Sequence, residues 1–182
     1  MRRLLAAAAG CVALACPATL PTASAQSADA TPQAAQIDAA DYVRRTADSN
    51  VFEIAAARAA LDKASSEDVR SFARMMADDH GKAADQLAEA AKGQNLATSL
   101  PDTVDAKHDQ VLQRLANATE QDFDLLYIRS QVEAHTEALK LQQDYSSFGG
   151  NPALKAVATQ LVPIIKRHHD EAQAILDRLS KG

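Results

Sequence analysis

Apolar residues recur at intervals of three and four positions along most of the chain, which is the spacing of residues on one face of an α-helix. One such stripe contains Val69, Phe72, Ala73, Met76, Ala83, Ala84 and Leu87. No useful length of the chain alternates apolar and polar residues with a period of two, the pattern of a half-buried strand. The pattern therefore predicts an all-α protein.

Residues that cap helices divide the periodic stretches. The four long helices are expected at about residues 38–63, 66–92, 120–148 and 152–179. The predicted N-terminal caps, whose side chains accept bonds from free backbone N–H groups, are Asp38, Ser65 or Ser66, Thr119 and Asn151. Between the second and third long helices, Pro101-Asp102-Thr103 predicts the cap of a short additional helix.

The connections between the predicted helices indicate how they are arranged. Short turns join the first helix to the second and the third to the fourth, whereas a long segment links the two pairs. This order is typical of a bundle with one crossover. We therefore predict a ferritin-like four-helix bundle whose long crossover carries the short extra helix.

Four polar residues fall one apiece on the four long predicted helices, in or beside the apolar stripes: Glu53, His80, His135 and His168. A buried imidazole without a partner loses its water at a cost of roughly 1–3 kcal/mol. At a rise of about 1.5 Å per residue, all four residues lie near mid-height of the predicted bundle. We therefore expect them to meet in its interior.

Two interpretations of this cluster remain open. The first is a buried network of hydrogen bonds that fixes the register of the helices. The second is a metal site for zinc, copper or non-haem iron, because imidazole binds these ions well. In that site Glu53 would join the three histidines, and Asp79 and Asp124 would be further ligands or carboxylates that orient a ring.

Several spaced motifs resemble the bacterial family called domain of unknown function 4142. They are Phe52-Glu53-Ile54, Phe72-Ala73-Arg74-Met75-Met76-Ala77-Asp78-Asp79-His80, Phe123-Asp124-Leu125-Leu126-Tyr127, His135, and Pro163 followed by His168. The resemblance covers about Asp38 to Leu176. It implies a ferritin-like four-helix fold and export, and members are often labelled as outer-membrane proteins. It implies no established activity.

Many ferritin-like bundles hold a di-iron centre, but this sequence disfavours one. Such centres use a Glu three residues before a His on two of the helices. Ala77 precedes His80 at that spacing, and Ile165 precedes His168. A ferroxidase or oxygen-activating centre is therefore not expected.

The first residues are typical of a secretory signal peptide. Arg2 and Arg3 precede an apolar run from Leu4 to Leu14, and Ala23-Ser24-Ala25 matches the small-residue pattern before a cleavage site. We predict a signal peptide at residues 1–25, a flexible segment at 26–37 and a helical domain at 38–180. The expected location is the periplasm. A lipoprotein anchored to the outer membrane through Cys11 or Cys16 is the alternative.

Processing changes the composition of the chain. Removal of residues 1–25 leaves 157 of the 182 residues and no cysteine, and it takes two arginines away, so the net charge falls from −5 to −7. The apolar run from Leu4 to Leu14 is too short to span a membrane permanently, since about 20 residues are needed, and no transmembrane segment is expected after processing. An acidic chain without Trp lacks the basic surface of nucleic-acid binders, so nucleic acid is not expected as a partner.

These features favour an exported, non-catalytic ferritin-like envelope protein with a binding or stress-related role. The first alternative is a periplasmic protein that binds or buffers a divalent transition metal, and the second is a degenerate metalloenzyme. Self-association is left open. The sequence identifies no protein partner.

Overall fold

The computed structural model describes residues 37–96, 101 and 103–181. Within these residues there are five helices and no strand, so the predicted all-α class is confirmed. The helices are α1 (Ala39–Lys63), α2 (Glu67–Gly93), α3 (Ala106–Asn117), α4 (Glu120–Phe148) and α5 (Pro152–Leu179). The predicted signal peptide and nearly all of the segment 26–37 lie outside the described residues. None of the described helices is both long enough and apolar enough to cross a membrane.

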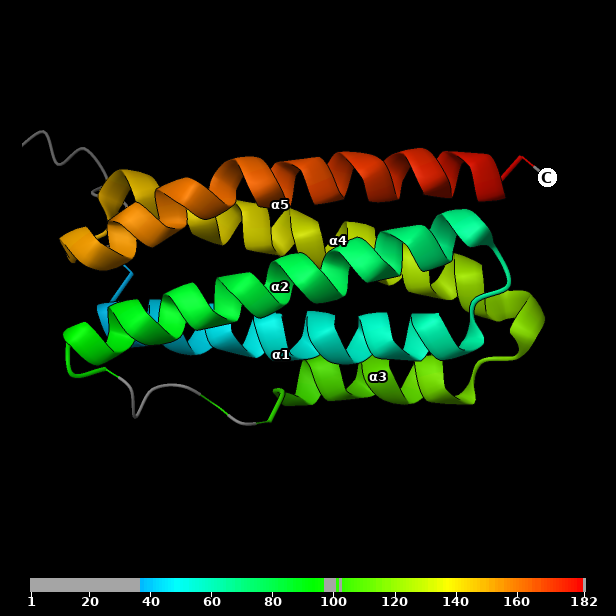
Figure 1. The fold of residues 1–182 in the computed structure, drawn as a ribbon, viewed down its shortest axis with the longest axis horizontal. Helices are drawn as coiled ribbons and strands as arrows, with labels where there is room; N and C mark the ends of the chain where they lie inside the picture. The colour runs from blue at the N-terminus through cyan, green and yellow to red at the C-terminus, as the bar shows by residue number, and fades with distance from the viewer. Residues whose placement is uncertain (1–36, 97–100, 102, 182) are drawn as a thin grey trace, which may run out of the picture. The chain divides into compact units, whose positions relative to one another are not determined.

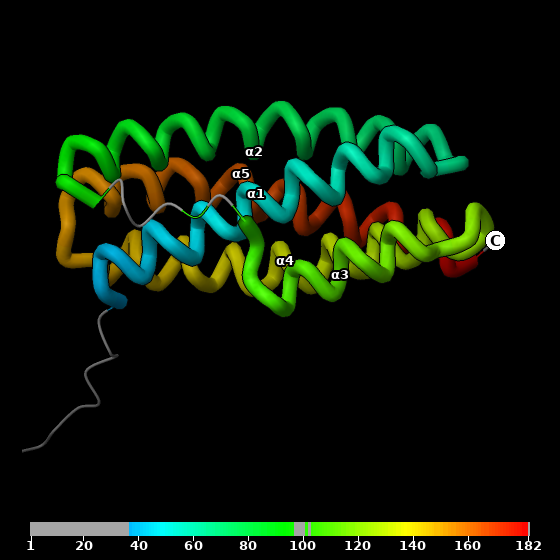
Figure 2. Tube along the Cα trace, turned by 90° about the horizontal axis from the view of Figure 1, so that it is seen from below, coloured from blue at the N-terminus to red at the C-terminus, as the bar shows by residue number. Residues whose placement is uncertain are grey.

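The four long helices lie side by side (Figure 1). Packing is most extensive within the pairs α1–α2 and α4–α5, and the pairs are joined by contacts of α2 with α5 and of α1 with α4. The short α3 packs against α1 and α4 (Figure 2). Because α3 runs back alongside α1, helices α2 and α4 point in the same direction (Figure 1).

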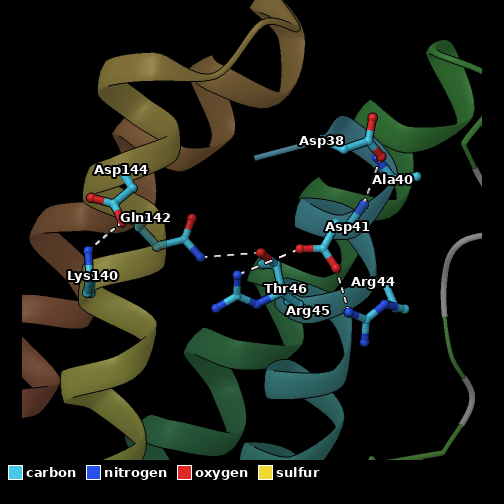
Figure 3. A network of polar contacts seen from close by, with 9 residues as sticks. All are labelled: Asp38, Ala40, Asp41, Arg44, Arg45, Thr46, Lys140, Gln142 and Asp144. Atoms are coloured by element: carbon cyan, nitrogen blue, oxygen red, sulfur yellow. Dashed lines mark hydrogen bonds and ion pairs between the residues drawn. The ribbon is translucent and has the colours of Figure 1, made fainter. Parts of the chain in front are cut away.

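The helix starts follow the capping chemistry of the sequence. Asp38 accepts bonds from the backbone N–H groups of Ala40 and Asp41 at the start of α1 (Figure 3). Thr119 caps α4, and Asn151 caps α5 directly before Pro152, as expected. These caps place the N-termini of three long helices within a residue of their predicted positions.

Two other helix starts differ from expectation. Helix α3 begins after Asp105 rather than after Pro101-Asp102-Thr103, because the Asp105 carboxylate accepts a bond from the His108 N–H at 2.9 Å. Ser66 is the N-cap residue of α2, but its hydroxyl makes no capping bond. Asp124 on α4 binds the turn just before the helix instead: its carboxylate accepts bonds from Ser66 N at 2.8 Å, Ser65 Oγ at 2.7 Å and Ser65 N at 3.2 Å.

The buried apolar side chains form two clusters. One contains Phe72 and Phe123 and lies toward the turn between α1 and α2. The other contains Tyr42 and Leu154 and lies toward the turn between α4 and α5. The long helices pass from one cluster to the other between Ala47 and Phe52, Met76 and Ala83, Ile128 and Leu141, and Ile165 and Ala172.

Polar contacts also join α1 to α4 inside the second cluster. Tyr42 donates its hydroxyl to Gln142 Oε1 at 2.8 Å, and the amide of Gln142 reaches the Thr46 hydroxyl at 3.4 Å (Figure 3). The Tyr42 ring stacks on Tyr145 with centroids 3.8 Å apart. These contacts fix the register of α1 against α4 near one end of the helices.

Candidate metal site

Polar side chains occupy the layer where the four long helices pass from one apolar cluster to the other. We call this the polar layer; it comprises Asn50, Glu53, His80, Gln131, His135 and His168, all of them buried. A layer of this kind is costly unless its groups find partners. The hydrogen-bond partners of these side chains therefore decide whether the layer is a satisfied network or a binding site.

Three imidazoles in this layer converge. His80 comes from α2, His135 from α4 and His168 from α5, and their ring centroids are 5.5–5.7 Å apart. One nitrogen from each ring lies within 4.8 Å of the nitrogens of the other two. Each side chain is at most 2 % exposed. The structure thus brings together three of the four residues on which the sequence hypothesis rested.

In two of the three rings, those of His80 and His135, one nitrogen forms a hydrogen bond with an oxygen acceptor. His80 Nδ1 lies 2.9 Å from Asn50 Oδ1, and His135 Nδ1 lies 2.8 Å from the backbone oxygen of Gln131. An oxygen acceptor requires the hydrogen to be on the nitrogen that it contacts. In each neutral ring the hydrogen is therefore on Nδ1, and Nε2 carries the lone pair.

The third ring is held by a carboxylate. His168 Nε2 lies 2.9 Å from Asp79 Oδ2, and the same oxygen accepts a bond from Arg167 at 2.7 Å. The neutral His168 ring therefore has its lone pair on Nδ1. The sequence analysis suggested that Asp79 orients a ring, and the geometry agrees with that role.

Among the described residues, the remaining nitrogens of the three rings have no hydrogen-bond partner. They are His80 Nε2, His135 Nε2 and His168 Nδ1. The cluster therefore offers three buried lone pairs on converging rings, and the opposite side of every ring is oriented by a hydrogen bond. This is the arrangement found around histidine ligands of metals, where the second nitrogen donates to an oxygen acceptor.

Burial favours the neutral form of these rings. Loss of water lowers the pKa of His80 well below its ordinary value, and the two neighbouring imidazoles lower it further. Burial lowers the pKa of His135 to about 3 and also lowers the pKa of His168. Neutral imidazole is the form that binds metal. At neutral pH the rings are therefore ready to act as ligands.

Glu53 lies beside the three rings. Its Oε1 is 3.7 Å from His135 Nδ1, and its Oε2 has no hydrogen-bond partner. Burial raises the pKa of Glu53 to about 8, so the carboxyl is mostly protonated at neutral pH. Glu53 does not belong to the group of mutually close donor atoms, which consists of the three histidines.

Asp124 lies elsewhere. It accepts bonds from Ser65 and Ser66 at the turn before α2, and among the described residues it is not in the group of close donor atoms formed by the three imidazoles. The sequence expected it as a further ligand or as a carboxylate that orients a ring. Its bonds at the α1–α2 turn explain its burial instead.

Sequence reasoning missed a second polar cluster, formed by Asp48, Asp105 and His108. His108 Nδ1 lies 2.6 Å from Asp48 Oδ2, and Asp48 Oδ1 accepts a bond from the Asp105 N–H at 2.6 Å. The His108 ring also stacks on Phe52 with centroids 4.3 Å apart. A cavity of about 100 Å³ adjoins this cluster. These bonds attach the start of α3 to α1. The sequence feature that could have indicated this cluster is His108, a histidine within the apolar stripe of the short predicted helix.

The comparisons with known proteins agree with the resemblance seen in the motifs. The model of the family described as Domain of unknown function (DUF4142) matches residues 23–175. This is most of the chain, so the chain belongs to that family. No curated protein and no solved structure matches it.

Proposed function

We propose that this member of the DUF4142 family binds one late first-row transition-metal ion between His80, His135 and His168. The observation that carries the proposal is the convergence of three buried imidazoles, each with one ring nitrogen that has no hydrogen-bond partner among the described residues. Each costs roughly 1–3 kcal/mol if it stays unpaired. A shared metal ion would satisfy all three at once.

The alternative is a network of hydrogen bonds without metal. Such a network would join the imidazoles to one another or to the side chains between them. Within the described residues, the hydrogen bonds of the three rings go to Asn50, to the Gln131 backbone and to Asp79, and none joins one imidazole to another. Each bond orients its ring and leaves the other nitrogen without a partner, which favours metal over a network.

The donor set selects the class of metal. Three neutral imidazoles suit zinc, copper, nickel and iron, whereas calcium and magnesium prefer oxygen ligands. With metal–nitrogen bonds of about 2.0–2.1 Å, the three nitrogens would lie about 3.3 Å apart in tetrahedral geometry. We propose a binding or buffering role rather than a reaction.

The scaffold that we propose is a ferritin-like four-helix bundle. Its support is the side-by-side packing of α1, α2, α4 and α5, with α2 and α4 pointing the same way and one crossover that carries α3 (Figure 1). A di-iron centre is disfavoured, because Ala77 and Ile165 stand where its Glu ligands would be expected. We propose export to the periplasm from the signal-like residues 1–25, and attachment to the outer membrane as a lipoprotein is the alternative.

Metal analysis tests this function. The mature protein, purified without a histidine tag or chelator and then dialysed against zinc, should retain one ion per chain. His135→Ala should lose it. His169→Ala is the matched control, because His169 is adjacent to His168 but its side chain is 28 % exposed and its Nδ1 lies 3.6 Å from Asp170. Absence of zinc from the parent protein, or equal retention by His135→Ala, would contradict the proposal.

A further inference from the structure

The three imidazoles differ in how they connect to the protein surface. The groups that hold His80 and His135 are Asn50 and Gln131, and both of these residues are buried. The group that holds His168 is Asp79, whose side chain is 21 % exposed. Of the three rings, His168 is therefore the one whose hydrogen bond leads toward solvent.

Asp79 connects the buried ring with a surface cation. Its Oδ2 accepts from His168 Nε2 at 2.9 Å and from Arg167 at 2.7 Å, and the Arg167 side chain is 56 % exposed. Asp79 also directly precedes His80 in α2. The carboxylate is thus adjacent in space to one candidate ligand and adjacent in sequence to another.

We propose that Asp79 is the outer binding point through which the metal cation enters the site, and that Arg167 is the group which the cation must displace. This inference rests on the proposed function. An ionised carboxylate is the natural first contact for an incoming divalent cation. Arg167 occupies the same oxygen and adds a positive charge, so it opposes the approach of the ion.

The contact between Asp79 and Arg167 is weak enough to act as a gate. Surface ion pairs contribute little net free energy, and the Arg167 side chain, 56 % exposed, is well solvated when it separates from Asp79. Once the ion replaces Arg167, it lies beside the His168 ring, whose Nε2 contacts Asp79 and whose Nδ1 has no hydrogen-bond partner among the described residues. Rotation of that side chain would then transfer the ion from Asp79 to the three nitrogens.

This route predicts a kinetic effect that a purely structural ion pair would not have. Replacing Arg167 by Met removes the competitor and should speed both entry and release by about 1.5- to 5-fold, the range expected for a surface ion pair. The equilibrium affinity should change less than either rate. Asp79→Asn should slow entry and also weaken binding about 10- to 100-fold, because it removes the carboxylate that holds His168.

The matched control is Lys166→Met. Lys166 precedes Arg167 on α5, its side chain is 61 % exposed, and it pairs with Asp170 at 2.6 Å rather than with Asp79. The two Met variants lose the same charge from the same region of the surface. A difference between them therefore reports the contact with Asp79 and not long-range electrostatics.

Stopped-flow absorption with cobalt(II) measures both rates, entry on mixing and release on adding a chelator. The proposal expects both rates to rise in Arg167→Met and to match the parent in Lys166→Met. Equal rates in the parent and Arg167→Met, or equal acceleration in both Met variants, would overturn it. Equilibrium titration separates this failure from that of the proposed function: a parent that binds no cobalt overturns both, whereas one that binds cobalt with unchanged kinetics overturns the entry route alone.

Discussion

Asn50 Oδ1 lies 2.9 Å from Nδ1 of His80, so the amide of α1 determines which nitrogen of a histidine on α2 keeps its lone pair. Asn50 is itself buried. The relationship makes Asn50 an orienting group for the candidate site, although it contributes no donor to it.

Replacing Asn50 by Ala should therefore weaken metal binding without removing a ligand. We expect a loss of about 10- to 100-fold in affinity, the usual effect of removing the acceptor that orients a metal-bound histidine. Asn50→Asp restores an oxygen acceptor and should recover most of the affinity. Competition titration against a chromophoric zinc chelator measures both values. Equal affinities in the parent and Asn50→Ala would show that the amide does not orient the ring.

Asp124 should affect stability and not metal binding. Its carboxylate accepts three bonds at the start of α2, so Asp124→Ala leaves two backbone N–H groups without their acceptor. We expect the free energy of unfolding to fall by about 1–3 kcal/mol. Urea denaturation of the metal-free protein checks this value, and zinc titration of the same variant should match the parent. A large loss of zinc affinity in this variant would show that Asp124 contributes to metal binding.

Much of the arrangement follows from local rules that the sequence displays. Thr119 and Asn151 mark the starts of α4 and α5, because caps depend on residues next to them in the chain. The common height of His80, His135 and His168 follows from the fixed rise of a helix. These features needed no knowledge of side-chain contacts.

The remaining features depend on partners that are distant in sequence. Asp124 accepts bonds from the turn before a helix that begins 57 residues earlier, and Asp48 accepts a bond from the Asp105 N–H before α3. Asn50 has no periodic signal that separates it from a solvated polar residue. Which ring nitrogen of His80 is free depends on the rotamer and on Asn50 together, so the sequence could predict the cluster but not its donor atoms.

The buried histidines should make the metal-free protein sensitive to acid. Their pKa values are lowered in the folded state, so the unfolded chain binds more protons below about pH 6.5 and folding loses stability as the pH falls. His80→Gln removes one of these groups. Between pH 7 and pH 5 the parent should lose about 1–2 kcal/mol more than this variant. Urea denaturation at both pH values measures the difference, and identical losses would mean that His80 is not buried as a neutral ring.

Glu53 should have the opposite effect. Burial raises its pKa to about 8, so the folded state keeps a proton that the unfolded chain releases, and stability is lost as the pH rises from about 4.5 to about 8. Glu53→Gln should avoid this loss. Relative to the parent, it should gain about 2–4 kcal/mol in the free energy of unfolding between pH 5 and pH 8 without metal. Glu171, exposed on α5, supplies the control Glu171→Gln, which should behave like the parent. No gain in Glu53→Gln would contradict a buried, protonated Glu53.

X-ray absorption spectroscopy of the zinc-loaded protein tests the central claim most directly, because it reports the atoms bonded to the metal. The account predicts three imidazole nitrogens at about 2.0–2.1 Å from zinc in the parent and in His169→Ala. His168→Ala should lose this signature. A zinc ion bound mainly by oxygen, or a spectrum unchanged in His168→Ala, would contradict a metal site between His80, His135 and His168.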